Sequence, residues 1–308
     1  MIPRFSGIKT FFRRPHVPYN SDEYKKAKKF DAAIVGVPFD IGVSFRTGQR
    51  EGPTAVRNIS HLCQYNYHPE QDKDISEYRI VDVGDIPVSP VIIEDAMQLC
   101  KKDIQTIAKN ARKVFVVGGD HTISYPVLKG LSDHYGEPLA LVHFDSHYDT
   151  LEEYFNCKCT HGTPFKRAVE DKAIDPFRSV HLGQHGTLYS KEVMTADKKL
   201  GFEGIRSEKL VKMDPKKVVD WIQKKVKNSK VYVSIDIDVL DPSAAPGTGT
   251  PECGGMLPRE LFAILREMRR LNIVGGDVME VLPSYDTSEL TSWAATNTLQ
   301  ELIVSALI

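Results

Sequence analysis

Short apolar runs recur along the chain, with polar segments between them. The clearest runs lie within residues 31–40, 113–120, 139–145, 179–183, 230–241 and 272–281. Inside each run Val, Ile, Leu and Ala follow one another and rarely alternate with polar residues. Continuous runs of this kind are typical of parallel strands that are covered on both faces. The pattern therefore predicts a mostly parallel sheet.

Segments with helical character lie between these runs, the clearest at residues 89–111, 214–229 and 258–271. Pro90 and Pro258 stand near the start of two of them, a position that helices accept. Strands that alternate with helices predict the α/β class. No linker, repeat or low-complexity tract interrupts the chain, so we expect a single domain over residues 1–308, with residues 1–30 as an N-terminal arm.

The amino-acid composition indicates which partners the protein binds and in which cellular compartment it works. The 308 residues carry a net charge of -1, with 41% hydrophobic and 26% charged residues. Surfaces that bind nucleic acid or membranes need a basic excess, so neither partner is expected. No apolar run is long enough for a membrane span. Five cysteines without framework spacing favour a reducing, cytoplasmic setting. The basic N-terminus leaves a mitochondrial location as the alternative.

Acidic and imidazole side chains gather where the predicted strands end. They are Asp120, His121, Asp145, His147, Asp149, Asp236, Asp238 and Glu280. Alternate residues of an extended segment point to one side, so the members of each group can face the same spot. Ligands of open parallel sheets bind beyond the carboxyl ends of the strands. If these strand ends are neighbours, one pocket holds about five carboxylates and at least two imidazoles.

So many like charges require a counter-charge, and divalent cations supply it. Carboxylate ligands with some imidazole suit manganese-like metals better than zinc. A pair of metals would activate water for hydrolysis. The alternative is that each Asp merely begins a turn, which explains one motif alone but not all of them together. His143 lies inside an apolar run, so we interpret it as a core histidine or as a support for a ligand.

Five longer motifs carry a resemblance to a known family. They are "GGDHTI" (118–123), "HFDSHYDT" (143–150), "THGTPFKRA" (160–168), "SIDIDVLDPSAAPGTGTPECGG" (234–255) and "DVMEVLPSYD" (277–286). In this order they resemble the ureohydrolases, which include arginases, agmatinases and guanidinobutyrases, and the last two types are the most similar. The resemblance implies a three-layer α/β/α fold, two Mn²⁺ per subunit with Ni²⁺ as the alternative, and a homotrimer or homohexamer.

The resemblance also implies which residues bind the metals. One metal would be held by His121, Asp145, Asp149 and Asp236, and the other by Asp145, His147, Asp236 and Asp238. Asp145 and Asp236 would bridge the two.

The implied reaction is hydrolysis of a guanidino compound to urea and an amine, in which a hydroxide between the metals attacks the guanidinium carbon. Asp149 and His161 resemble the residues that move the proton. Glu280 resembles the carboxylate that binds the guanidinium through paired N–H bonds. Without the resemblance, His161 reads as a loop histidine and Glu280 as a solvent-facing charge at a strand end.

The residues around the substrate tail depart from the family pattern. Near the expected mouth of the site, Gln184 and His185 stand where relatives have an apolar residue and Arg. Beside the metals, Ser146 stands where the family usually has alanine. Glu153 and His185 are therefore the candidate tail contacts. Glu152 and Glu153 would attract a cationic tail such as that of agmatine. An anionic tail such as that of 4-guanidinobutyrate would prefer Lys158 or Arg167.

The loop after Asp149 lacks the polar residues with which arginases hold arginine, so arginine is disfavoured. Free guanidine and longer guanidino acids stay open as substrates. Two other classes also stay open: a non-catalytic metal-binding homologue, and a deacetylase of related fold. Cys157 and Cys159 have no second Cys/His pair at zinc spacing, so a structural zinc site is not expected.

Overall fold

An eight-stranded sheet forms the centre of the computed structural model, which describes residues 3–63 and 66–308. Its strands lie in the order β4-β1-β5-β10-β9-β6-β7-β8, and the pairings between neighbours are parallel. The strands are β1 (Ala32–Val37), β4 (Ile80–Asp85), β5 (Val114–Gly118), β6 (Ala140–Phe144), β7 (Val180–Leu182), β8 (Glu203–Ile205), β9 (Val231–Asp236) and β10 (Ile273–Met279). A separate hairpin joins β2 (Tyr67–His68) to β3 (Lys73–Asp74).

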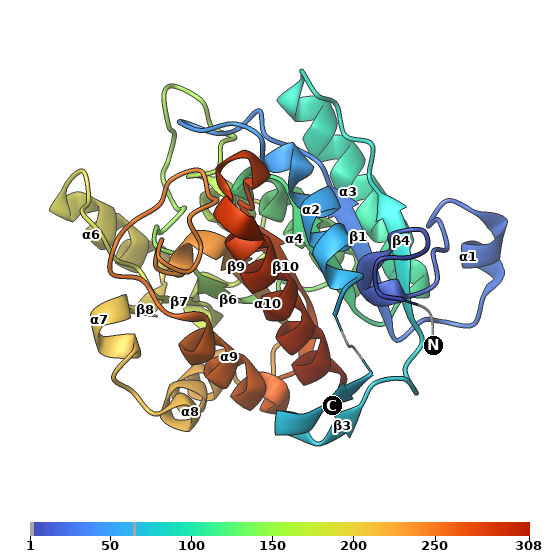
Figure 1. Ribbon diagram of the computed structural model, residues 1–308. Helices are drawn as coiled ribbons and strands as arrows, with labels where there is room; N and C mark the ends of the chain where they lie inside the picture. Colours follow the sequence, from blue (N-terminus) through green and yellow to red (C-terminus); the bar gives the residue numbers. More distant parts are fainter. Residues whose placement is uncertain (1–2, 64–65) are drawn as a thin grey trace.

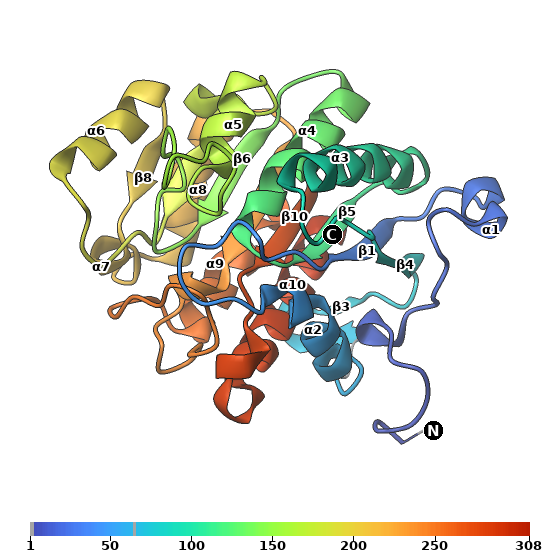
Figure 2. The same cartoon turned by 90° about the horizontal axis from the view of Figure 1, so that it is seen from above.

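Helices cover both faces of this sheet. They are α1 (Asp22–Lys26), α2 (Gly52–Ser60), α3 (Ile93–Asn110), α4 (Ser124–Tyr135), α5 (Pro164–Glu170), α6 (Lys191–Leu200), α7 (Ser207–Leu210), α8 (Pro215–Val226), α9 (Pro258–Glu267) and α10 (Leu290–Leu307). In Figure 1, α2, α9 and α10 lie in front of the sheet. Figure 2 shows α3, α4 and α5 on the opposite face. The three-layer α/β/α architecture expected from the sequence is confirmed.

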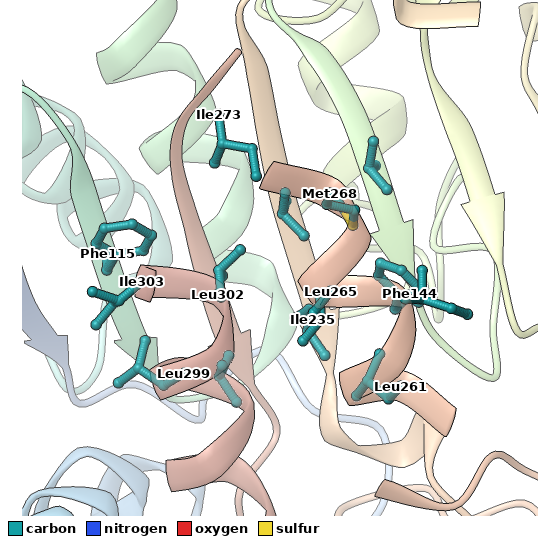
Figure 3. Close-up of a cluster of buried hydrophobic side chains, with 14 of the residues drawn as sticks. Phe115, Phe144, Ile235, Leu261, Leu265, Met268, Ile273, Leu299, Leu302 and Ile303 are labelled. Atoms are coloured by element: carbon teal, nitrogen blue, oxygen red, sulfur yellow. The ribbon is translucent and has the colours of Figure 1, made fainter. Parts of the chain in front are cut away.

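Two hydrophobic cores explain why the strands read as continuous apolar runs. Ala32 and Ile34 of β1 belong to the core beneath α2, α8, α9 and α10, whereas Ala33 and Val35 belong to the core beneath α3, α4 and α5. Figure 3 shows the first core, where Leu299 of α10 and neighbouring side chains pack over the sheet. Each such aliphatic side chain, when buried, stabilises the fold by about 1.5–3 kcal/mol.

The helix ends follow from local sequence. Asp214 precedes α8, and its carboxylate accepts the backbone N–H of Lys217 at 3.2 Å. Glu260 in the first turn of α9 accepts the backbone N–H of Leu257 at 2.8 Å, and Pro258 occupies a position where no N–H is needed. The helices predicted at 214–229 and 258–271 therefore form with slightly shorter bounds.

The edge strands carried too little signal to be predicted. The β4 segment contains Asp82 and Asp85 among its apolar residues, and β8 has only three residues. Asp82 is buried at the edge, where Arg57 Nε donates to it at 2.9 Å. Tertiary contacts, rather than periodicity, define these strands. Among the described residues, no helix has both the length and the apolar character needed to cross a membrane.

Candidate metal centre

Four neighbouring strands at the centre of the sheet end beside one another. In the order β5, β10, β9 and β6, they lead into His121, Glu280, Asp236 and Asp145 respectively. His121 and Asp236 are 115 positions apart in the sequence. The parallel topology brings them together at the carboxyl edge, as expected from the strand-end pattern.

Three carboxylates surround one imidazole nitrogen. His121 Nδ1 lies 3.2 Å from Asp145 Oδ2, 3.2 Å from Asp149 Oδ2 and 3.1 Å from Asp236 Oδ2. All four residues are buried. Ligand atoms of His121, Asp145 and Asp149, together with one of His143, lie within 4.8 Å of one another. The set offers oxygen and imidazole ligands to a single cation.

A second group adjoins the first through Asp145. His147 Nδ1 lies 3.3 Å from Asp145 Oδ1 and 3.2 Å from Asp238 Oδ2. The two oxygens of Asp145 therefore face different groups, which is the arrangement of a bridging carboxylate. Asp238 Oδ1 accepts hydrogen bonds from Ser146, whereas the buried Oδ2 has no aligned donor. A cation at this position would satisfy that oxygen.

The electrostatics of these groups also favour bound cations. Burial, with the charges of Asp238 and Asp145, raises the pKa of Asp236 well above its usual value. Burial and the charge of Asp145 raise the pKa of Asp149 to about 6. Closely spaced carboxylates repel one another when all are ionised, and divalent cations between them stabilise the anionic forms. The two groups together are called the metal cluster below, and its members are His121, Asp145, His147, Asp149, Asp236 and Asp238.

His143 lies beside the metal cluster but has other partners. Its Nε2 is 2.8 Å from Asp145 Oδ2, and its Nδ1 is 2.7 Å from His181 Nδ1. Burial is the main reason that its pKa falls to about 3. Because both ring nitrogens contact protein groups, we interpret His143 as a support that orients Asp145.

Glu280 lies at the end of β10 in a left-handed backbone conformation, with φ 64°. Its Oε1 accepts the backbone N–H of His121 at 3.0 Å, and its Oε2 accepts Gln49 Nε2 at 2.9 Å. A Cβ at Gly249 would lie 3.1 Å from Oε2, so glycine leaves the space beside the carboxylate open. Glu280 is buried, so it is not a solvent-facing charge. Asp149, with φ 54°, shares this uncommon conformation, which is often found at functional sites.

His161 connects Glu280 to the loop after β1. Its Nδ1 lies 3.3 Å from Glu280 Oε1, and its Nε2 lies 2.8 Å from Ser44 Oγ and 3.2 Å from the Ser44 amide nitrogen. Burial lowers the pKa of His161, but the hydrogen bond and charge of Glu280, with further acidic neighbours, raise it to about 9. The ring is thus fixed beside the metal cluster rather than free in a loop.

A cavity of about 570 Å³ opens above the metal cluster. His147, Asp149, His161 and Asp236 lie on its lining. The outer part, called the tail pocket below, is lined by Ser44, Phe45, Arg46, Leu151, Tyr154, Thr187, Leu188, Tyr189, Val193, Thr250, Pro251 and Glu252. Its walls are largely apolar, with one cationic and one anionic side chain. A small molecule with a short aliphatic chain fits this chemistry.

The two candidate tail contacts lie elsewhere. Glu153 is exposed and outside the described lining of the cavity, and its neighbour Glu152 pairs with Lys166 at 2.8 Å. His185 is buried and is also absent from the described lining. Lys158 and Arg167 do not line the cavity either, and Arg167 contacts Glu152. The long loop from 150 to 160 has no regular spacing, so its direction could not be inferred from the sequence.

Three residues that the sequence did not single out belong to the site: Arg46 and Glu252 in the tail pocket, and Gln49 against Glu280. Gln49 Nε2 donates both to Glu280 and to the carbonyl of Arg46, at 3.0 Å. Glu252 lies within the 234–255 motif that carried the family resemblance, and that was the available signal for it.

Comparison with known proteins agrees with this geometry. Residues 30–305 match the model of the arginase family. The chain belongs to this family. It is 36% identical to guanidinopropionase of Pseudomonas aeruginosa, over 98% of this chain and 92% of the relative. It is 34% identical to guanidinobutyrase of the same bacterium, over 98% and 93%. The solved structure of proclavaminate amidinohydrolase from Streptomyces clavuligerus superposes with a TM-score of 0.90 at 35% identity, covering 99% of each chain.

Membership settles the class of the protein. As an arginase-family member it is a hydrolytic enzyme that acts on small guanidino compounds, and the predicted resemblance and fold are confirmed. The family depends on a binuclear metal centre, and the metal cluster offers two adjoining groups of ligands for one. The deacetylase alternative is therefore set aside.

Proposed function

We propose that the protein hydrolyses a guanidino compound with a short tail, of the agmatine or 4-guanidinobutyrate type, to urea and an amine. The observation that carries the proposal is the position of Glu280, which is buried beside the metal cluster and held by His121. A carboxylate there can bind a planar guanidinium by paired hydrogen bonds and orient its carbon toward the cluster.

The proposal assigns two Mn²⁺ ions to this chain, with Ni²⁺ as the alternative. His121, Asp145, Asp149 and Asp236 would hold one ion, and Asp145, His147, Asp236 and Asp238 the other. The paired contacts of Asp145 and the unaligned oxygen of Asp238 support this assignment. Two divalent cations would activate a water for attack near neutral pH.

The chain's own residues would then handle the substrate and the proton. Glu280 binds the guanidinium, and the apolar walls of the tail pocket exclude water from its chain. Asp149 accepts the proton of the attacking water. His161, fixed 3.3 Å from Glu280, passes a proton to the departing amine nitrogen, which leaves poorly unless it is protonated.

The test is urea release by manganese-loaded and nickel-loaded protein from agmatine, 4-guanidinobutyrate, 3-guanidinopropionate, arginine and guanidine. Turnover of at least one short-tailed compound, and little of arginine, is expected. Absence of urea from every compound with both metals bound would refute the proposal and favour a non-catalytic homologue. We further propose a single domain over residues 1–308, a cytoplasmic location and a homotrimer or homohexamer, the last of which light scattering would measure.

A further inference from the structure

His185 lies outside the tail pocket but contacts two segments that form or lead into it. Thr187 to Tyr189 follow it along the chain and line one wall. Thr250 to Glu252 line another wall, and the His185 ring bonds to this segment. His185 is only 7% exposed, so its contacts are internal.

Both ring nitrogens of His185 face carbonyl oxygens. Nδ1 lies 2.8 Å from the Gly183 oxygen, and Nε2 lies 3.0 Å from the Glu252 oxygen. A carbonyl oxygen only accepts, and a neutral imidazole carries a single N–H. Two hydrogen bonds therefore require a proton on each nitrogen. The Glu252 carboxylate, which lies against Gly186, supplies a negative charge close by, since a Cβ on Gly186 would be 2.3 Å from its Oε2.

The main chain around His185 is held by hydrogen bonds to two neighbouring segments. The backbone N–H of His185 donates to the Ser146 oxygen at 3.1 Å, and Gln184 Nε2 donates to the His147 oxygen at 3.3 Å. Ser207 N also donates to the Gln184 oxygen at 3.1 Å. Gln184 and His185 are thus fixed to the segment that carries Asp145, His147 and Asp149 of the metal cluster.

The wall at 249–253 has far less support of its own. Within the described part of the chain, the bond from His185 Nε2 to Glu252 is the only hydrogen bond that reaches the main chain of residues 249–253. The next main-chain bond is at Gly254, whose N–H donates to Asp241 at 2.9 Å. Loss of the His185 bond would release this wall from the segment that carries Asp145 and His147.

We propose that His185, protonated on both ring nitrogens, is a positioning residue that holds the 249–253 wall of the tail pocket and so determines the affinity for the substrate tail. The expected effect on substrate affinity rests on the proposed function, whereas the structural role of His185 does not. His185 has no contact with a residue of the metal cluster and reaches the cavity only through the main chain of Glu252, so the chemical step should depend on it little.

The kinetic test compares His185→Gln with His185→Arg, and uses His134→Gln on α4 as the matched control. Glutamine cannot donate from two opposite positions, whereas arginine keeps a permanent cation with several donors. We expect KM for the tailed substrate to rise about tenfold in His185→Gln, the effect of one lost hydrogen bond. We expect kcat and metal content to stay unchanged, and His185→Arg to recover most of the affinity. An unchanged KM, or a loss of kcat with metal, would overturn the proposal.

A second measurement does not depend on activity. A glutamate-specific protease should cleave after Glu252 more than about fivefold faster in His185→Gln than in wild type, because an unanchored wall opens more often. His185→Arg and His134→Gln should be cleaved at the wild-type rate. Equal cleavage of all four proteins would overturn the positioning role. If wild type released no urea but cleavage rose as expected, the proposed function would fail while the role of His185 would stand.

Discussion

The Glu280 carboxylate accepts the backbone N–H of His121 at 3.0 Å. One hydrogen bond thus connects the residue proposed to bind the guanidinium with a residue proposed to bind a metal. Glu280 directly follows β10, and His121 begins a short helical turn just beyond the neighbouring strand β5, so the sheet sets most of their separation. This rigidity would hold the substrate carbon at a constant distance from the metal cluster.

Replacing Glu280 with glutamine tests the guanidinium contact. The amide keeps the size of the side chain but loses its charge and one acceptor. We expect kcat/KM to fall by at least about a hundredfold, since hydrogen bonds to charged groups are the strong ones. Metal content, measured by elemental analysis, should remain at the wild-type level. A variant with wild-type kcat/KM would show that Glu280 does not hold the substrate.

The same substitution should change how the metal-free protein responds to pH. Glu280 helps to raise the pKa of His161 to about 9, above its ordinary value of 6.5. A histidine with a raised pKa stabilises the fold fully below pH 6.5, and the contribution disappears as the pH rises through 9. Glu280→Gln should flatten this decline in chemical-denaturation stability between the two values. NMR titration of the His161 ring would report the lowered pKa directly.

The assignment of ligands predicts unequal losses of metal. Asp236 is proposed to bind both ions, whereas Asp238 is proposed to bind one. Asp238→Asn should therefore retain close to one ion per chain, and Asp236→Asn should retain fewer. Both should reduce urea release by at least about a hundredfold, because mutation of residues that only support metal ligands already lowers metal affinity or activity about 10- to 100-fold. Equal and full metal content in both variants would contradict the assignment.

The charges of the tail pocket should determine which tail is preferred. Glu252→Gln should lower kcat/KM for agmatine relative to 4-guanidinobutyrate, and Arg46→Met should shift the ratio the other way. Because a partly exposed ion pair between the tail and a pocket side chain is weak, we expect the ratio of the two kcat/KM values to change by about three- to fivefold. Glu208→Gln, an exposed substitution on α7, is the control. If neither pocket variant changes the ratio, the tail does not reach these side chains.

The sequence predicted the centre of the molecule better than its margins. The central strands are buried on both faces, so their apolar runs were unambiguous, and the acidic residues at their ends converge because parallel strands share an edge. Arg46 and Gln49 could not be placed, because they lie in a loop that reaches Glu280 only after folding. The positions of Glu153 and His185 depend on loop paths for which no periodic pattern exists.

The central claim is that the metal cluster, with Glu280, cleaves a short-tailed guanidino compound. The most direct test is to remove metal with a chelator, reload the protein with Mn²⁺ or Ni²⁺, and measure bound metal and urea release together on 4-guanidinobutyrate, 3-guanidinopropionate and agmatine. We predict no urea without metal, and release that rises to a maximum at two ions per chain. Two bound ions without urea from any of the three compounds would contradict the claim.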